Sequence, residues 1–202
     1  MGKPVLILGL TGNIASGKSS VAELLRRKGA RLLSADQLAR EVVAPGTALL
    51  TRVVGLFGDG VLQEDGQLDR QALAQRVFSD AEARSQLNAL LHPAIGRLAE
   101  QRLAEMCDEG DSLVVYEAPL LFEAGAEKRV DRILVVTISP QEQLRRLIQR
   151  DKLGSDDARR RIAAQMSQAD KVARADFVVD NSGSLEELEV QVEKLWRELS
   201  AG

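Results

Sequence analysis

The sequence predicts a three-layer α/β fold in which helices flank a parallel five-stranded sheet. Apolar runs of strand length alternate along the chain with longer helical stretches, which is the pattern of βαβ units. The first run is continuously apolar, and such a run indicates a strand that is covered on both faces. A chain of 202 residues with 45% hydrophobic and 28% charged residues is large enough to bury the core of such a fold.

The first βαβ unit is predicted within the opening 34 residues. Residues 5–8 form the apolar strand, and a glycine-rich loop follows it. Helix formers occupy residues 20–28, and Gly29 is a suitable C-terminal stop. Residues 31–34 then form the second strand, so strand, helix and strand fit within the usual length of this motif.

Three further strands are expected at residues 112–116, 132–138 and 177–179. Residues 48–108 contain many helix formers and no convincing strand, which predicts a helical insertion. The last helix has an apolar stripe at three- and four-residue steps, formed by Leu185, Leu188, Val192, Leu195 and Leu199.

Composition narrows the classes of partner and compartment. The 27 basic and 30 acidic residues give a net charge of −3, so the chain lacks the basic footprint of a nucleic-acid-binding protein. Cys107 is the sole cysteine, which excludes an intrachain disulfide and fits a reducing cytoplasm. The N-terminal apolar run is too short for a signal peptide or a membrane span, so no membrane association is expected.

The loop GNIASGKS fits the phosphate-binding pattern GxxxxGK[ST] at every fixed position, with a buried strand before it and a helix after it. Backbone N–H groups in such a loop point at a phosphate, so we predict a P-loop NTPase fold. Lys18 is expected to reach the β- and γ-phosphates, and Ser19 to bind Mg²⁺. A helix that merely starts after a Gly/Ser-rich turn is the alternative. The predicted ATP contacts are Gly12, Asn13, Ile14, Ala15, Ser16, Gly17, Lys18, Ser19 and Ser20.

The rest of the chain favours a small-molecule kinase. The guanine-reading tetrapeptide Asn-Lys-x-Asp of GTPases does not occur. Asp36 follows the second predicted strand, and ligands of open α/β sheets bind beyond the carboxyl ends of strands. Asp36 is therefore a candidate acceptor-site carboxylate, although it also suits the cap of a helix that begins near Gln37.

Six arginines between residues 145 and 161 suggest a lid that closes over phosphates. Arg146 and Arg150 share one helical face at an i, i+4 step, and residues 152–155 break the helix as a hinge would. We assign the lid role to these two arginines. A solvated surface helix is the alternative for the remaining ones.

Eight fragments in order resemble the dephospho-CoA kinase family, which phosphorylates the ribose 3′-hydroxyl of dephospho-CoA. They are GLTGNIASGKS, SADQLAREVVAPG, LDRQALAQRVF, LNALLHPAI, APLLFE, QLRRLIQRD, RIAAQM and ADFVVDNSGSLEELE, and they cover nearly the entire chain. Two departures stand out: Ser34 replaces a common aspartate, and Asn13 and Ala15 occupy positions where glycine is frequent. The side chains of residues 13 and 15 are therefore expected to point away from the phosphates.

The resemblance implies roles for individual residues. Asp36 resembles the family's catalytic carboxylate, Arg150 a lid arginine, and Asn181 the DNSG-loop residue near adenine. His92 can equally serve local structure, and Arg70 and Glu123 can equally pair with neighbours. The implied catalytic residues are Asp36, Lys18, Arg150 and Arg146, and the implied substrate contacts are Asp36, Arg70, His92, Pro119, Leu120 and Glu123.

We therefore expect one P-loop kinase domain spanning residues 1–202. Its nucleotide core comprises residues 3–47, 111–140 and 174–202, its acceptor-binding insertion residues 48–110, and its lid residues 141–173. The expected substrates are ATP, with Mg²⁺, and 3′-dephospho-CoA, without a nucleic acid, membrane or obligate protein partner. A nucleoside or nucleotide kinase and a non-catalytic nucleotide-binding regulator are the alternatives.

Overall fold

The computed structural model describes residues 5–78, 80–109 and 112–201. The chain divides into two compact units, one comprising Met1–Ser34 and Leu103–Gly202, the other Ala35–Arg102. The second unit corresponds to the expected insertion at 48–110 but begins and ends earlier. Residues 3, 110 and 111, at which expected ranges begin or end, lie outside the described residues.

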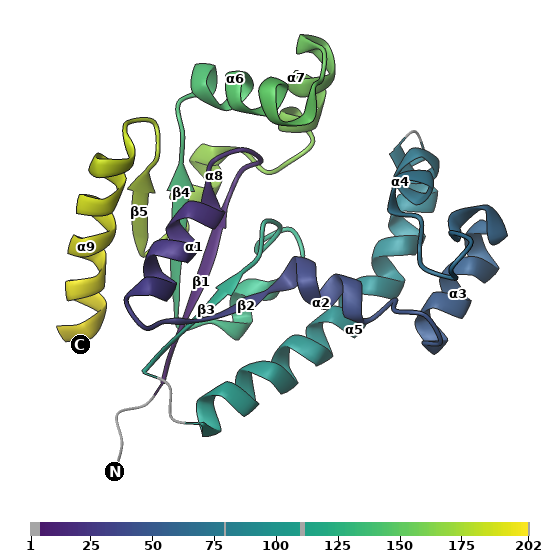
Figure 1. The fold of residues 1–202 in the computed structure, drawn as a ribbon, viewed down its shortest axis with the longest axis horizontal. Helices are drawn as coiled ribbons and strands as arrows, with labels where there is room; N and C mark the ends of the chain where they lie inside the picture. The colour runs from purple at the N-terminus through teal and green to yellow at the C-terminus, as the bar shows by residue number, and fades with distance from the viewer. Residues whose placement is uncertain (1–4, 79, 110–111, 202) are drawn as a thin grey trace. The chain divides into compact units, whose positions relative to one another are not determined.

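The first unit contains a five-stranded parallel sheet, which confirms the predicted fold class (Figure 1). Each predicted strand is present, and the apolar runs of the three inner strands are more buried than those of the two edge strands. In sheet order the strands are β2 (Arg31–Ser34), β3 (Leu113–Glu117), β1 (Leu6–Gly12), β4 (Arg132–Thr137) and β5 (Phe177–Asp180).

Strand β1 is longer than the sequence pattern predicted, since it continues past Leu8 to Gly12. Its pairing with β3 reaches Leu10, opposite Glu117, and its pairing with β4 reaches Gly12, opposite Val136. The two flanking strands therefore hold the GLTG residues in extended form. The phosphate-loop motif consequently begins inside the central strand.

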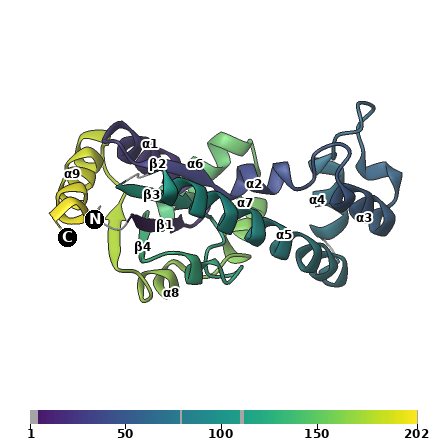
Figure 2. The same cartoon turned by 90° about the horizontal axis from the view of Figure 1, so that it is seen from below.

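Helices cover both faces of this sheet, and Figure 2 shows α1 and α8 on opposite sides of the strands. One core combines alternate residues of β1, β3 and β4 with the apolar stripes of α1 and α9. The helices of this unit are α1 (Lys18–Arg27), α6 (Pro140–Asp151), α7 (Ser155–Ala163), α8 (Gln168–Val172) and α9 (Leu185–Ala201), with the short 3₁₀ helix η2 (Ala126–Arg129).

The ends of two helices differ in detail from the prediction. Helix α1 begins at Lys18 instead of residue 20, and it is followed by Gly29 with a φ of 107° as expected for a C-terminal stop. In α9 the stripe residues Leu188, Val192 and Leu195 are buried. Leu185 is 58% exposed because it is the first residue of that helix.

The second unit is helical, as predicted, and its own core gathers Leu50, Val53, Phe57, Leu73 and Leu87. Among the described residues its one β-type pairing is an isolated bridge between Leu62 and Leu68. Its elements are α2 (Ala35–Glu41), α3 (Ala48–Phe57), η1 (Asp59–Val61), α4 (Arg70–Phe78) and α5 (Ala81–Asp108), the last of which ends in the first unit.

No helix within the ranges that the structure describes is both long and apolar enough to span a bilayer.

Candidate active site

The loop between β1 and α1 presents backbone donors at a helix N-terminus. The N–H groups of Ala15, Gly17 and Ser19 donate no hydrogen bond within the described part of the chain. Gly17, with a φ of 83°, precedes the first residue of the ten-residue helix α1. Unpaired N–H groups and the positive end of the helix dipole together favour an anion, so this loop is the candidate phosphate site.

Two polar side chains of the loop add to this site. The Lys18 ammonium donates to the carbonyl oxygens of Gly12 at 2.9 Å and Asn13 at 3.2 Å, which holds the positive charge against the loop. The Ser16 hydroxyl is fully buried and makes no hydrogen bond among the described residues. Ser19 and Ser20 are exposed in the first turn of α1.

Ser19 is the residue that fits a magnesium ion here. The described residues contain no group of three or more His, Cys, Asp or Glu side chains able to hold a metal. Mg²⁺ at a nucleotide site commonly takes one or two protein oxygens and completes its shell with phosphate oxygens and water. One exposed hydroxyl beside the phosphate donors is thus compatible with that mode of binding.

The glycines of the motif are required by close packing. A Cβ atom on Gly12 would lie 2.5 Å from the carbonyl oxygen of Val136, a backbone atom held in the sheet. A Cβ atom on Gly17 would overlap the side-chain amide of Asn181. Asn181 is 7% exposed and donates through Nδ2 to the carbonyl oxygen of Ser16 at 2.8 Å. The structure therefore places Asn181 directly against the phosphate loop.

The two residues that replace frequent glycines are accommodated differently. The Asn13 side chain is 4% exposed and donates through Nδ2 to the carbonyl oxygen of Met166 at 3.1 Å, so it faces another segment of the first unit. Ala15 has a left-handed φ of 62°, a conformation that costs an L-residue about 1–2 kcal/mol. That cost explains why glycine is favoured at position 15.

Of the two expected lid arginines, the structure brings Arg146 to the loop. The Nε atom of Arg146 donates to Oε1 of Glu142 at 2.7 Å. Its Nη2 atom donates to the carbonyl oxygen of Asn181 at 3.0 Å. Arg150 is exposed and donates to Asp151 at 2.7 Å, and Asp151 also pairs with Arg161. The predicted helix break is confirmed, since α6 ends at Asp151 and α7 begins at Ser155.

Glu142 provides a test of how Arg146 is held. Hydrogen bonds from Arg145 and Arg146 lower the pKa of Glu142 from 4.5 to about 2. A carboxylate with a lowered pKa in the folded state contributes stability above its unfolded value, and the contribution is lost as the pH falls through the folded value. We expect Glu142→Gln to be less stable than the wild type above about pH 4.5, with the difference disappearing toward pH 2, in urea denaturation at several pH values.

Glu23 offers a matched control for this prediction. It pairs with Arg26 and Arg27 at the same i, i+3 and i, i+4 steps, and these arginines lower its pKa to about 2 as well. Glu23→Gln should show the same pH dependence of stability, but only Glu142→Gln should weaken ADP binding severalfold. Equal ADP affinity in both variants would contradict a role for Glu142 in holding Arg146.

The acceptor residues expected near position 120 are organised by a buried lysine. Lys171 has no exposed side-chain surface, and its ammonium donates to the carbonyl oxygen of Pro119 and to Oε1 of Glu123, both at 3.0 Å. Glu123 Oε1 also accepts the N–H of Met166 at 3.2 Å. Glu123 therefore pairs with a neighbouring side chain, which was the alternative to a substrate contact. Leu120 is 44% exposed. No local pattern pointed to Lys171, because a lysine is normally exposed.

The remaining predicted residues lie in the helical unit. Asp36 is exposed in the first turn of α2, and because that helix begins at Ala35, the interpretation of Asp36 as the cap of a helix starting near Gln37 is wrong. Arg70 donates to the carbonyl oxygen of Ala39 at 3.1 Å. Burial and nearby Arg40 lower the pKa of Arg70, and nearby Asp36 raises it, which places Arg70 among these charges.

His92 lies within a continuous helix. It is half-buried in α5, and Pro93 follows it inside the same helix. Pro93 therefore does not mark a helix start.

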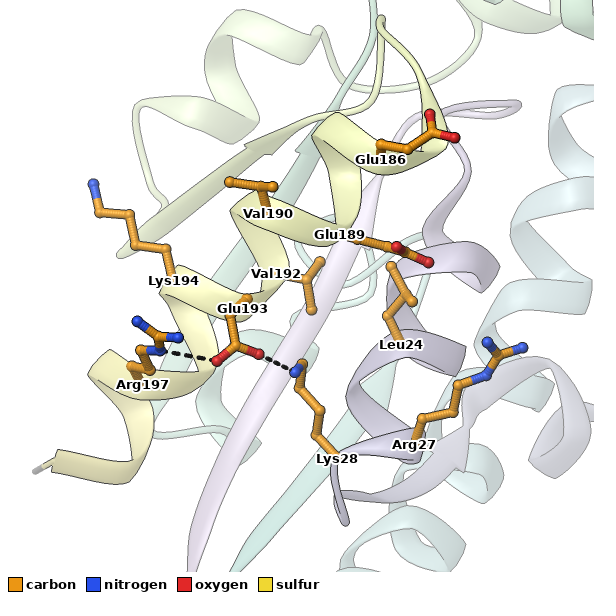
Figure 3. Close-up of a pocket in the computed structure, with 10 residues that line it drawn as sticks. All are labelled: Leu24, Arg27, Lys28, Glu186, Glu189, Val190, Val192, Glu193, Lys194 and Arg197. Atoms are coloured by element: carbon orange, nitrogen blue, oxygen red, sulfur yellow. Dashed lines mark hydrogen bonds and ion pairs between the residues drawn. The ribbon is translucent and has the colours of Figure 1, made fainter.

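A groove of about 890 Å³ between α1 and α9 is a different surface (Figure 3). Figure 3 shows Lys28 and Arg197 both directed at Glu193, and both form ion pairs with that carboxylate. The lining contains none of the predicted site residues. Because its charges largely neutralise one another, this groove offers no concentrated charge for a phosphate, and the phosphate loop remains the candidate site.

Comparisons with known proteins point to one family, and the matches cover nearly the whole chain. The family model described as dephospho-CoA kinase matches residues 6–187. A dephospho-CoA kinase of Geobacter sulfurreducens is 50% identical, covering 94% of this chain and 96% of its own length. A crystal structure from Thermus thermophilus has a TM-score of 0.82 at 40% identity, covering 98% and 99% of the two chains. A dephospho-CoA kinase from Campylobacter jejuni has a TM-score of 0.74 at 28% identity, covering 97% and 98%.

Proposed function

The chain belongs to the dephospho-CoA kinase family, and on that premise we propose that it transfers the terminal phosphoryl group of ATP to the ribose 3′-hydroxyl of 3′-dephospho-CoA, giving coenzyme A and ADP. The observation that carries this proposal is the phosphate loop. Around the N-terminus of α1, the N–H groups of Ala15, Gly17 and Ser19 have no acceptor in the described part of the chain, and Lys18 lies in the same turn. That arrangement suits a triphosphate and stabilises the charge of phosphoryl transfer.

The nucleotide roles follow from these positions. Residues 12–20 bind the phosphates, Ser19 would hold Mg²⁺, and Asn181 closes the nucleotide site from the DNSG segment. Mg²⁺, when bound, neutralises phosphate charge and orients the transferring group. Lys18 and Arg146 stabilise the charge that develops on the phosphate oxygens, and Arg150 joins them when residues 141–173 act as a lid.

The acceptor roles rest on the family and on the helical unit. Asp36 accepts the proton of the 3′-hydroxyl as that oxygen attacks the γ-phosphorus. Arg70, whose guanidinium lies among the charges around Asp36, binds the anionic acceptor. His92, Pro119, Leu120 and Glu123 complete the proposed acceptor contacts, with Glu123 acting through its pair with Lys171.

The single cysteine fits a reducing cytoplasm as the compartment.

The direct test is to incubate the protein with ATP, Mg²⁺ and dephospho-CoA and to identify the product by mass spectrometry. We expect a mass gain of one phosphoryl group on the ribose 3′-oxygen, with stoichiometric ADP. Nucleosides and nucleotides offered as acceptors in the same assay test the nearest alternative. Transfer to one of them but not to dephospho-CoA would overturn the proposal, and ATP binding without transfer to any acceptor would indicate a regulator.

A further inference from the structure

Two glutamine side chains form hydrogen bonds with the main chain of the phosphate loop at a single residue, Ile14. The N–H of Ile14 donates to Oε1 of Gln165 at 2.7 Å, and the carbonyl oxygen of Ile14 accepts from Nε2 of Gln143 at 2.9 Å. Gln143 lies on α6 and is 6% exposed, and Gln165 follows α7. We call these two hydrogen bonds the glutamine clamp.

The chemistry of the backbone fixes the orientation of both side chains. A backbone N–H can only donate, so Gln165 must present its carbonyl oxygen to Ile14. A backbone carbonyl can only accept, so Gln143 must present its NH₂ group. The two glutamines therefore have opposite hydrogen-bonding roles, although they are chemically the same residue.

The clamp fixes two consecutive peptide groups. The Ile14 N–H belongs to the peptide that joins residues 13 and 14, and the Ile14 carbonyl belongs to the peptide that joins residues 14 and 15. Because both peptide groups are held, the backbone torsions of Ile14 are set. The clamp therefore also determines how the chain enters Ala15, which has the left-handed φ of 62°. Strained conformations of this kind persist only where surrounding contacts determine them.

Neighbouring contacts extend the same attachment. Asn13 Nδ2 donates to the carbonyl oxygen of Met166 at 3.1 Å, next to Gln165 in the chain. The Ser16 N–H donates to the carbonyl oxygen of Asn13 at 3.1 Å, which closes the turn. Among the described residues, the N–H groups of Ala15 and Gly17 then remain without a hydrogen-bond acceptor.

We propose that Gln143 and Gln165 are positioning residues for phosphoryl transfer, acting through the main chain of Ile14 to hold the loop N–H groups in their phosphate-binding directions. This inference rests on the proposed function of the loop. Donors that are fixed before the ligand arrives need no reorganisation when charge develops on the phosphate, so a clamp on the loop favours both binding and transfer. Neither glutamine contacts the phosphate in this proposal.

The first test uses shortened side chains that keep the amide. Gln143→Asn and Gln165→Asn cannot span the same gap, and we expect each to raise the Kd for Mg·ADP about fivefold to 100-fold in calorimetric titration. The KM for dephospho-CoA should stay within about twofold, because the clamp acts on the nucleotide side. Gln141→Asn, an exposed position on the same helix, is the matched control and should retain wild-type affinity.

The second test exploits the opposite roles of the two side chains. Gln165→Glu keeps an acceptor for the Ile14 N–H, whereas Gln143→Glu replaces the donor with a carboxylate that faces a carbonyl oxygen. In hydrogen exchange of the Ile14 amide followed by NMR, we expect Gln165→Glu to remain protected like the wild type and Gln165→Asn to exchange faster. Gln143→Glu should melt at a lower temperature than Gln165→Glu.

The outcomes separate the clamp from the proposed function. Wild-type ADP affinity in both Asn variants, or equal Ile14 exchange in Gln165→Asn and the wild type, would overturn the clamp even if the protein makes coenzyme A. A wild type that binds ADP but yields no phosphorylated product would overturn the proposed function and leave the ADP titrations as a valid test of the clamp. If an Asn variant does not fold, the paired Glu variants still decide the roles of the two amides.

Discussion

Replacing Asp36 by asparagine should lower kcat by about 10²- to 10⁴-fold, the usual contribution of a general base. Asparagine has nearly the same shape but cannot accept the proton of the 3′-hydroxyl. Asp36 is exposed in the second position of α2, so the fold should survive the change. Steady-state kinetics should show the loss in kcat, while the Kd for Mg·ADP stays within about twofold of the wild type.

Asp156 is the matched control for this experiment. It is also exposed and also occupies the second position of a helix, α7, so Asp156→Asn removes the same favourable charge from a helix N-terminus. Both variants should lose a similar, small amount of stability, and only Asp36→Asn should lose activity. An unchanged kcat in Asp36→Asn would reduce Asp36 to a residue that stabilises its helix.

Replacing Gly17 by alanine should remove measurable nucleotide binding and lower the free energy of unfolding by about 2–5 kcal/mol. The added methyl group would overlap the side-chain amide of Asn181, which in turn bonds to the carbonyl oxygen of Ser16. The φ of 83° adds the strain of a left-handed alanine. Urea denaturation measures the stability loss, and ADP titration measures the loss of binding.

Gly46 separates backbone strain from the clash. Its φ is 84°, nearly that of Gly17, but no heavy atom lies within 4 Å of the position of a Cβ atom there. Gly46→Ala should therefore lose only about 1–2 kcal/mol and should bind ADP like the wild type. If Gly17→Ala bound ADP with wild-type affinity, the close approach of Asn181 to the loop would have no functional meaning.

Local patterns accounted for much of what the sequence predicted correctly. All five strands are short apolar runs that can be recognised from their own residues, and the phosphate loop is a contiguous motif. The extension of β1 to Gly12 was missed because Gly9 and Gly12 are poor strand formers. Pairing with neighbouring strands that lie more than 100 residues away in the chain holds them extended.

Residues that act through distant partners were missed for a related reason. Lys171 is fully buried, and its two partners, Pro119 and Glu123, lie 52 and 48 residues away in the chain. Gln143 and Gln165 lie 129 and 151 residues from Ile14. A glutamine on a helix and one in a turn have no local feature that distinguishes a backbone partner from solvent. The proposed roles of Asp36 and Arg150 came from the family resemblance and stay predictions.

The contact between Asn181 and the phosphate loop also bears on how the protein is synthesised. Ser16 leaves the ribosome early, but its partner follows 165 residues later. At about 5–20 residues per second, translation needs about 8–33 s to cover that distance. A nascent chain therefore carries its phosphate motif for most of its synthesis without the asparagine that completes it, and competence to hold nucleotide arises only near the end of translation.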